Sequence, residues 1–227
     1  MRILAIDTAL AACAAAVFET DGGRTLAAES LTMARGHAEA LMPLIARVMD
    51  KAATEFAELD RIAVTVGPGS FTGLRVGISA ARGIALASGK PAVGLSTLSA
   101  YAAPHIAHED GGAVVAAIDA RHGHVYLQVF ANSGRTLIAP MATTVAEAVH
   151  AALPGSARIV GSGAALLAAD WPKEALPPLL FEPREAPAIE WVARVGAAVV
   201  PSDKAPTPLY LRPPDARPQD AARLPRR

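Results

Sequence analysis

The stretch AIDTALAACAAAVF, residues 5–18, returns as AIDARHGHVYLQVF at residues 117–130. The two copies lie 112 residues apart at both ends. Each copy reads as a strand, a turn and a second strand, with an aspartate (Asp7 and Asp119) where the first strand ends. A repeat of this length exceeds the roughly 20–50 residues of a solenoid unit. It therefore predicts two related domains in one chain, with a cleft between them.

Hydrophobic periodicity on either side of the copies predicts the remaining elements. In the first half we expect strands at 2–7, 13–19, 25–31, 59–66 and 92–95, and helices at 36–51, 72–87 and 97–105. In the second half we expect a strand pair over 114–130, strands at 136–139 and 157–160, and helices at 145–153 and 188–199. The last helix is expected to cross back onto the first half.

The same order of strands and helices, run twice, predicts a duplicated α/β fold with a mixed sheet in each lobe. This is the layout of the actin-like (ASKHA, ribonuclease H-like) folds. We expect an N-terminal lobe over residues 1–108 and a C-terminal lobe over 109–212. The composition changes beyond residue 212, and residues 213–227 are expected to form a disordered tail.

Composition narrows the classes of function. The net charge of +0 argues against a surface that coats nucleic acid, because phosphate neutralisation needs excess Lys and Arg. Aromatic residues make up 4%, too few for a base-stacking platform. The single Cys13 excludes an internal disulfide and predicts a buried thiol. Met1 leads directly into a strand, and no apolar run reaches the about 20 residues of a membrane span. We expect a cytoplasmic protein that does not associate with a membrane.

The run VGPGSFTGLRVG, residues 66–77, has the strongest local signature. Its glycines predict a tight turn with a positive φ, and Ser70 or Thr72 is suited to cap the helix that follows. A helix N-terminus can bind an anion, but the Gly-Lys-Ser/Thr of a P-loop is absent. An anion site and a purely structural turn both remain open. The loop comprises Gly67, Pro68, Gly69, Ser70, Phe71 and Thr72.

The helix after this loop carries a stripe of small residues. Gly73, Gly77, Ala81 and Ala85 recur every four residues, which lets another element approach closely. Two interpretations remain open at this point. The stripe packs on the sheet of its own domain, or, with the helix at 36–51, it forms a docking surface for another chain.

The turns that would hold phosphate in an enzyme of this fold are degraded. Asp7 is followed by residues 8–12, TALAA, whose Cβ atoms hinder the close backbone approach that phosphate needs. Asp119 is followed by a turn with a single glycine, Gly123. The run GSGA at residues 161–164 is only a partial adenosine-type loop. We therefore expect no tightly bound cofactor on this chain alone.

Metal and nucleophile patterns are also incomplete. The pairs His105/His108 and His122/His124 have no third ligand nearby in the sequence, and His37 does not begin a His-x-x-x-His pair. Ser70 stands in GSFTG rather than Gly-x-Ser-x-Gly. The sequence predicts no catalytic residue and no metal site.

Five motifs, spread over residues 1 to about 212, carry a resemblance to a known family. They are IDT at 6–8, HAEALMPLI at 37–45, GPGSFTGLRVG at 67–77, DAR at 119–121 and PLYLR at 208–212. Together they resemble the TsaB family, also called YeaZ. The HGH at residues 122–124 departs mildly from the charged pattern that commonly follows DAR in the family.

The resemblance implies a role in placing threonylcarbamoyl on N6 of adenosine 37 in tRNAs that read codons starting with A. It implies a non-catalytic subunit that supports a TsaD-like catalytic subunit, which transfers the group from threonylcarbamoyl-AMP. A TsaE-like ATPase joins the two, tRNA is met through the complex, and the subunit alone forms homodimers. ATP or ADP at the complex interface is left open.

In the family the interface is a helical bundle of the first-domain helices, here residues 36–51 and 72–88. The residues predicted to form it are Glu39, Leu41, Leu44, Ile45, Val48, Gly73, Arg75, Gly77, Ala81 and Arg82. Two other functions remain open. One is a stand-alone small-molecule kinase of the same fold, and the other is a peptidase.

Overall fold

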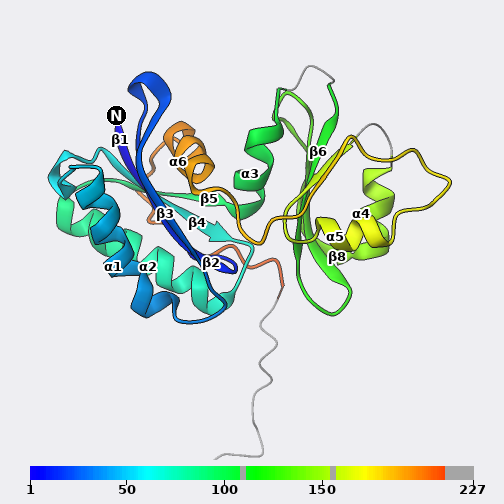
Figure 1. Ribbon diagram of the computed structural model, residues 1–227, viewed down its shortest axis with the longest axis horizontal. Helices are drawn as coiled ribbons and strands as arrows, with labels where there is room; N and C mark the ends of the chain where they lie inside the picture. Colours follow the sequence, from blue (N-terminus) through cyan, green and yellow to red (C-terminus); the bar gives the residue numbers. More distant parts are fainter. Residues whose placement is uncertain (108–110, 154–156, 213–227) are drawn as a thin grey trace, which may run out of the picture.

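The computed structural model describes residues 1–107, 111–153 and 157–212 (Figure 1). The first sheet has the strand order β3-β2-β1-β4-β5, and the second has the order β10-β9-β6-β7-β8. The first sheet comprises β1 (Arg2–Asp7), β2 (Ala12–Glu19), β3 (Arg24–Thr32), β4 (Arg61–Gly67) and β5 (Ala92–Ser96). The second comprises β6 (Ala113–Asp119), β7 (His124–Phe130), β8 (Thr136–Thr144), β9 (Ala157–Val160) and β10 (Leu180–Glu182).

Both sheets are mixed in the same way. In each, three antiparallel strands are followed by a strand that pairs in parallel with the first, β4 with β1 and β9 with β6. The repeated stretches form equivalent hairpins, in which Asp7 pairs with Ala14 and Asp119 pairs with Val125. The duplicated, actin-like α/β fold expected from the sequence is confirmed.

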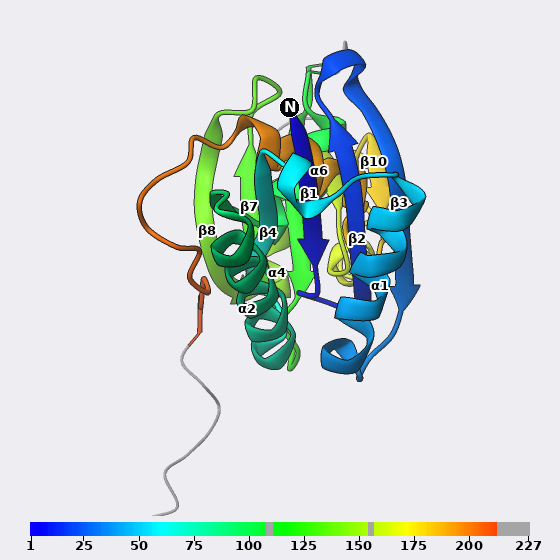
Figure 2. The ribbon, with the colours of Figure 1, turned by 90° about the vertical axis from the view of Figure 1, so that its left-hand side faces the viewer.

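Helices cover both faces of the first sheet. Helices α1 (His37–Lys51) and α2 (Phe71–Ser88) lie side by side on one face, and α6 (Ile189–Ala198) lies on the other (Figures 1 and 2). Strands buried on both faces read as nearly continuous apolar runs, as β1 and β4 do. The expected return of the last helix to the first half is confirmed.

Buried Arg61 fixes the end of α6 on the first sheet. Its Nη1 donates to the carbonyl oxygens of Gly196, Ala197 and Val199 at 2.9, 2.8 and 2.7 Å. These carbonyls lie at the helix C-terminus, where no intrahelical donor reaches them. A Cβ on Gly196 would lie 2.3 Å from that of Ala63, so glycine lets the helix sit directly on β4.

The second sheet is covered by α4 (Val145–Ala152) and α5 (Ala164–Ala169) on one face and by α3 (Thr97–Ala102) on the other. The chain therefore crosses between the lobes twice, through α3 and before α6 (Figure 1). Tyr101 of α3 is buried, and its hydroxyl donates to the Arg184 carbonyl on the second crossing, at 2.8 Å.

Several element boundaries differ from expectation. The helix expected to run to residue 105 ends at Ala102 and continues as a short 3-10 turn, η3 (Ala103–His105), because Pro104 lacks a backbone donor. Strand β8 continues past residue 139 to Thr144, since an edge strand tolerates Pro140. Helix α5 and strand β10 were not expected. They have six and three residues, too few for a periodic signal.

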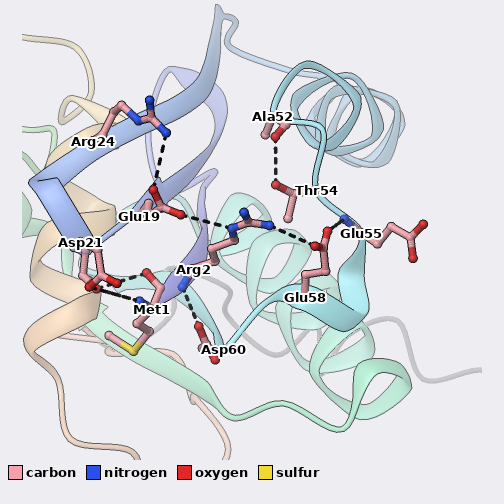
Figure 3. Close-up of polar contacts among 11 residues, drawn as sticks. Met1, Arg2, Glu19, Asp21, Arg24, Ala52, Thr54, Glu55, Glu58 and Asp60 are labelled. Carbon is pink, nitrogen blue, oxygen red and sulfur yellow. Dashed lines mark hydrogen bonds and ion pairs between the residues drawn. The ribbon is translucent and has the colours of Figure 1, made fainter.

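Two further 3-10 turns, η1 (Asp21–Gly23) and η2 (Phe56–Glu58), lie at the outer end of the first sheet. There Arg2 joins β1 to its neighbours (Figure 3). Its guanidinium pairs with Glu19 at 3.4 Å and Glu58 at 3.2 Å, and its backbone N–H donates to Asp60 at 2.7 Å. These pairs are exposed or half-buried, and their role is to order the loop before β4.

After α6 the chain continues as a strap, residues 200–212, that has no helix or strand. It returns along the first lobe, where the Leu209 N–H donates to the Val66 carbonyl at 2.7 Å. The predicted disordered tail, residues 213–227, lies outside the described residues. No helix in the described ranges has the length and apolar character needed to cross a membrane.

Candidate protein-docking surface

The glycine-rich loop, residues 67–72, leads from the end of β4 into the first turn of α2. Gly67 has φ 118°, a left-handed value that favours glycine. Ser70 is the N-cap, as expected, and its Oγ accepts a hydrogen bond from the Gly73 N–H at 3.3 Å. The Ser70 N–H donates to the Ala9 carbonyl at 2.7 Å. The end of α2 is thus fixed on the turn that follows β1.

The first two residues of the small-residue stripe of α2, Gly73 and Gly77, face this same turn. A Cβ on Gly73 would lie 2.1 Å from the Thr8 carbonyl oxygen, and one on Gly77 would lie 2.4 Å from Thr8 Oγ1. A Cβ on Gly69 would lie 2.3 Å from the Ala9 carbonyl oxygen. The glycines let the β1–β2 turn press against the helix. The interpretation as packing within the domain is therefore the correct one.

Seven of the ten residues predicted to form the docking surface are buried in the first lobe. They are Leu41, Leu44, Ile45, Val48, Gly73, Gly77 and Ala81. The four α1 side chains are at most 1% exposed because the apolar face of α1 covers the first sheet. In the isolated chain these residues support the two helices, and of the seven only Leu41 also lines the hollow between α1 and α2.

The other three predicted residues, Glu39, Arg75 and Arg82, are exposed on the outer faces of α1 and α2. Sequence reasoning missed the apolar neighbours that accompany them. Met42 is 49% exposed, and Leu86 is 87% exposed. The α1/α2 groove, a hollow of about 520 Å³ between the helices, is lined by Ala38, Leu41, Met42, Phe71, Thr72, Arg75, Val76, Ser79 and Ala80.

An exposed cluster of two aromatic rings and one arginine borders this groove. Phe71 stacks on Tyr210 of the strap, with ring centroids 5.4 Å apart and an interplanar angle of 28°. The Arg75 guanidinium lies 3.7 Å from the centroid of the Phe71 ring, and its Nε donates to the Tyr210 hydroxyl at 3.3 Å. Both rings remain 44% exposed. The motif at 208–212 contained Tyr210 but gave no indication of where it packs.

Gly83 differs from the other glycines of α2. It is exposed, and a Cβ placed on it would meet nothing within 4 Å. Glycine in the middle of an exposed helix costs about 1 kcal/mol relative to alanine. Nothing within the described part of this chain requires glycine there.

The aspartates of the repeat differ from each other in accessibility. Asp7 is fully buried, and burial raises the pKa of its carboxyl, although the Thr65 hydroxyl and the Ala9 N–H donate to Oδ1 at 2.5 and 3.0 Å. Asp119 lines an interlobe cavity of about 470 Å³ and pairs with Arg121 at 3.4 Å. Asp7 does not line that cavity.

The remaining polar candidates have structural surroundings. The Ser162 hydroxyl accepts from the Asp119 N–H at 3.2 Å, and a Cβ on Gly161 would lie 2.4 Å from the Ala117 carbonyl oxygen. His37 is buried against the Leu10 carbonyl, 3.1 Å from Nε2. His105 is mostly buried and pairs with Glu182 at 3.5 Å.

The predicted burial of Cys13 is confirmed, and burial raises the pKa of its thiol to about 11. Within residues 1–107, 111–153 and 157–212, no three His, Cys, Asp or Glu side chains gather as a metal site. Among the described residues, the α1/α2 groove and its aromatic–arginine cluster combine exposed apolar, aromatic and charged side chains on one surface.

Comparison with known proteins finds a family model and relatives that are named for a tRNA modification. Residues 31–215 match the family model described as "TsaD: tRNA N6-adenosine threonylcarbamoyltransferase". The tRNA threonylcarbamoyladenosine biosynthesis protein TsaB of Escherichia coli is 40% identical over 126 residues, which are 56% of this chain. The matched stretch spans 53% of the E. coli protein.

Two other comparisons cover nearly the whole chain. An uncharacterized protein of Mycobacterium tuberculosis is 36% identical over 218 residues, 95% of this chain and 94% of that protein. The structure of YeaZ from Pseudomonas aeruginosa superposes with a TM-score of 0.75 at 26% identity, covering 92% of this chain and 99% of that one.

Proposed function

Because the chain belongs to the TsaB (YeaZ) family, we propose that it acts in the biosynthesis of threonylcarbamoyladenosine in tRNA, as a non-catalytic partner subunit. In this role it supports a TsaD-like catalytic subunit that transfers threonylcarbamoyl from threonylcarbamoyl-AMP to N6 of adenosine 37. The α1/α2 groove is the docking surface. A TsaE-like ATPase completes the complex, and the same surface pairs two copies when the chain is alone.

One observation carries this proposal: the exposed cluster of Phe71, Arg75 and Tyr210 beside the apolar groove. Aromatic residues and arginine are enriched among the few residues that dominate binding energy in protein interfaces. Met42 lines the groove, and Leu86, Glu39 and Arg82 are further exposed residues of the same two helices. An apolar centre with a polar rim is typical of a protein–protein interface.

The interlobe cavity supports the non-catalytic half of the proposal. Asp7 is sealed from it, and Asp119 pairs with the Arg121 guanidinium at 3.4 Å. The Thr8 and Ala9 carbonyls of the turn after β1 lie against Gly73 and Gly69, so this part of the turn packs on the start of α2. No observation favours the kinase or the peptidase, since the Ser70 hydroxyl caps α2.

Charge reversal tests the docking surface. We expect Arg75→Glu combined with Arg82→Glu to weaken binding to the TsaD homologue from the same source by at least about tenfold, equivalent to about 1.4 kcal/mol. Co-purification and titration calorimetry measure the affinity. A tRNA modification assay, run with and without the variant, measures the consequence.

The matched control is Arg135→Glu, an exposed arginine on the β7–β8 connection of the other lobe. It should bind and support modification as the unaltered chain does. The proposal fails if the double reversal, folded by circular dichroism, still binds the TsaD homologue with unchanged affinity.

A further inference from the structure

The strap makes several close contacts with the first lobe. Its Leu209 carbonyl oxygen lies 2.7 Å from the position of a Cβ on Gly67, so glycine is needed there for the strap to pass. The Leu209 N–H donates to Val66, and Tyr210 stacks on Phe71. The strap is therefore part of the rim of the α1/α2 groove, and a subunit seated on the groove would cover Tyr210.

Two residues further on, the strap reaches the second lobe. Arg212 Nη1 donates to the Ala120 carbonyl at 3.1 Å, in the turn between β6 and β7. In this turn Arg121 and His122 have φ values of 64° and 52°, in the left-handed region that non-glycine residues seldom adopt. Ala120 and Arg121 also line the interlobe cavity.

Two residues of chain span at most about 7 Å, so Tyr210 and Arg212 cannot move independently over larger distances. We propose that the strap couples occupancy of the α1/α2 groove to the conformation of the β6–β7 turn at the interlobe cavity. Tyr210 is the contact that a docked subunit covers, and Arg212 passes the change to the turn. This inference rests on the proposed function, because it requires a subunit on the groove.

Such coupling requires that the docked subunit bind with different affinity to two conformations of the strap. A docked subunit shifts the turn only if it binds one position of Tyr210 better than another. The turn suits such a response because its two left-handed non-glycine residues are held by surrounding hydrogen bonds, of which the Arg212 bond is one. If the bond between Arg212 and the Ala120 carbonyl is lost or shortened, the conformation of the turn should change.

Amide hydrogen exchange of the full chain, with and without the purified TsaD homologue, tests the coupling. In the unaltered chain the added subunit should slow exchange in α2 and change exchange in residues 120–126. In Arg212→Met, whose side chain has no donor, the protection of α2 should persist and the change in the turn should be lost. Arg212→Lys, which can still donate to the Ala120 carbonyl, should recover part of it.

Arg135→Met serves as the control and should respond in both regions. The coupling is overturned if the turn responds in Arg212→Met as in the unaltered chain. It is also overturned if α2 is protected in the unaltered chain while the turn does not change. Absence of protection in both α1 and α2 contradicts the proposed function itself, so the two failures are distinguishable.

Discussion

At the scale of single residues, Asp7 shows that the repeated aspartate can be present and still be inaccessible to a ligand, because its side chain is buried. Both hydrogen bonds to its carboxylate go to Oδ1, and Oδ2 is buried without a hydrogen-bond partner in the described structure. Burial disfavours the charged form, which is why the pKa of Asp7 is raised. The sequence places Asp7 at the end of a strand but does not show that the following turn closes over it.

Replacing Asp7 by asparagine should remove a pH-dependent decrease in the free energy of unfolding. The folded chain keeps the Asp7 proton to higher pH than the unfolded chain, whose carboxyl titrates near pH 4. Stability should therefore fall as the pH rises from about 4 through the raised folded pKa, by up to about 1.4 kcal/mol per pH unit. Asp7→Asn should lack this decline and be more stable than the unaltered chain at pH 7.

Urea unfolding between pH 4 and 8 measures this difference. Asp50→Asn is the control, because Asp50 is exposed on α1 and the same loss of charge there should change little. Curves for Asp7→Asn that run parallel to those of the unaltered chain would show that Asp7 carries no such cost.

At the scale of elements, helix α2 contains one glycine that close packing requires, Gly73, and one that meets no neighbour, Gly83. Gly73→Ala forces a Cβ against the Thr8 carbonyl and should lower the free energy of unfolding by about 2–3 kcal/mol. Gly83→Ala meets open space and should raise it by about 1 kcal/mol. Denaturant unfolding of the two variants provides the comparison. Equal effects would mean that the fit between α2 and the β1–β2 turn does not matter.

Helices α1 and α2 also show what a sequence pattern can and cannot establish. The spacing of Leu41, Leu44 and Val48 predicted a helix with one apolar face, and this is confirmed. It did not show that this face covers the first sheet, because periodicity is the same whether a face meets its own domain or a partner. The exposed pair of Phe71 and Tyr210 could not be predicted, since its members are 139 residues apart and lack a shared repeat.

At the scale of the whole molecule, Tyr101 links the two crossings between the lobes. Its hydroxyl is buried, and burial raises the pKa of Tyr101 above its usual range. Tyr101→Phe should lower the free energy of unfolding by about 1 kcal/mol, because the Arg184 carbonyl loses its donor. Tyr210→Phe, which changes an exposed hydroxyl, is the control. Denaturant unfolding measures both variants. If the unfolding curves of Tyr101→Phe and the control coincide, this bond has no role in joining the lobes.

The overall architecture was predictable because the repeat at residues 5–18 and 117–130 fixed both hairpins, and helical periodicity placed α1, α2 and α6. The short elements α5 and β10 and the path of the strap were not. Their positions depend on contacts with distant residues, such as that of Leu209 with Val66, and not on local periodicity.

The position of α6 has a consequence for synthesis of the chain. One face of the first sheet, including Ile3, Ala5 and Phe18, packs against Ile189 and Val192 near the end of the sequence. While the ribosome has made only residues 1–108, that face lacks α6 and is covered only in part, by Ala100 of α3. The first lobe to be translated is therefore completed last, and a fragment that ends at residue 108 would expose an apolar sheet.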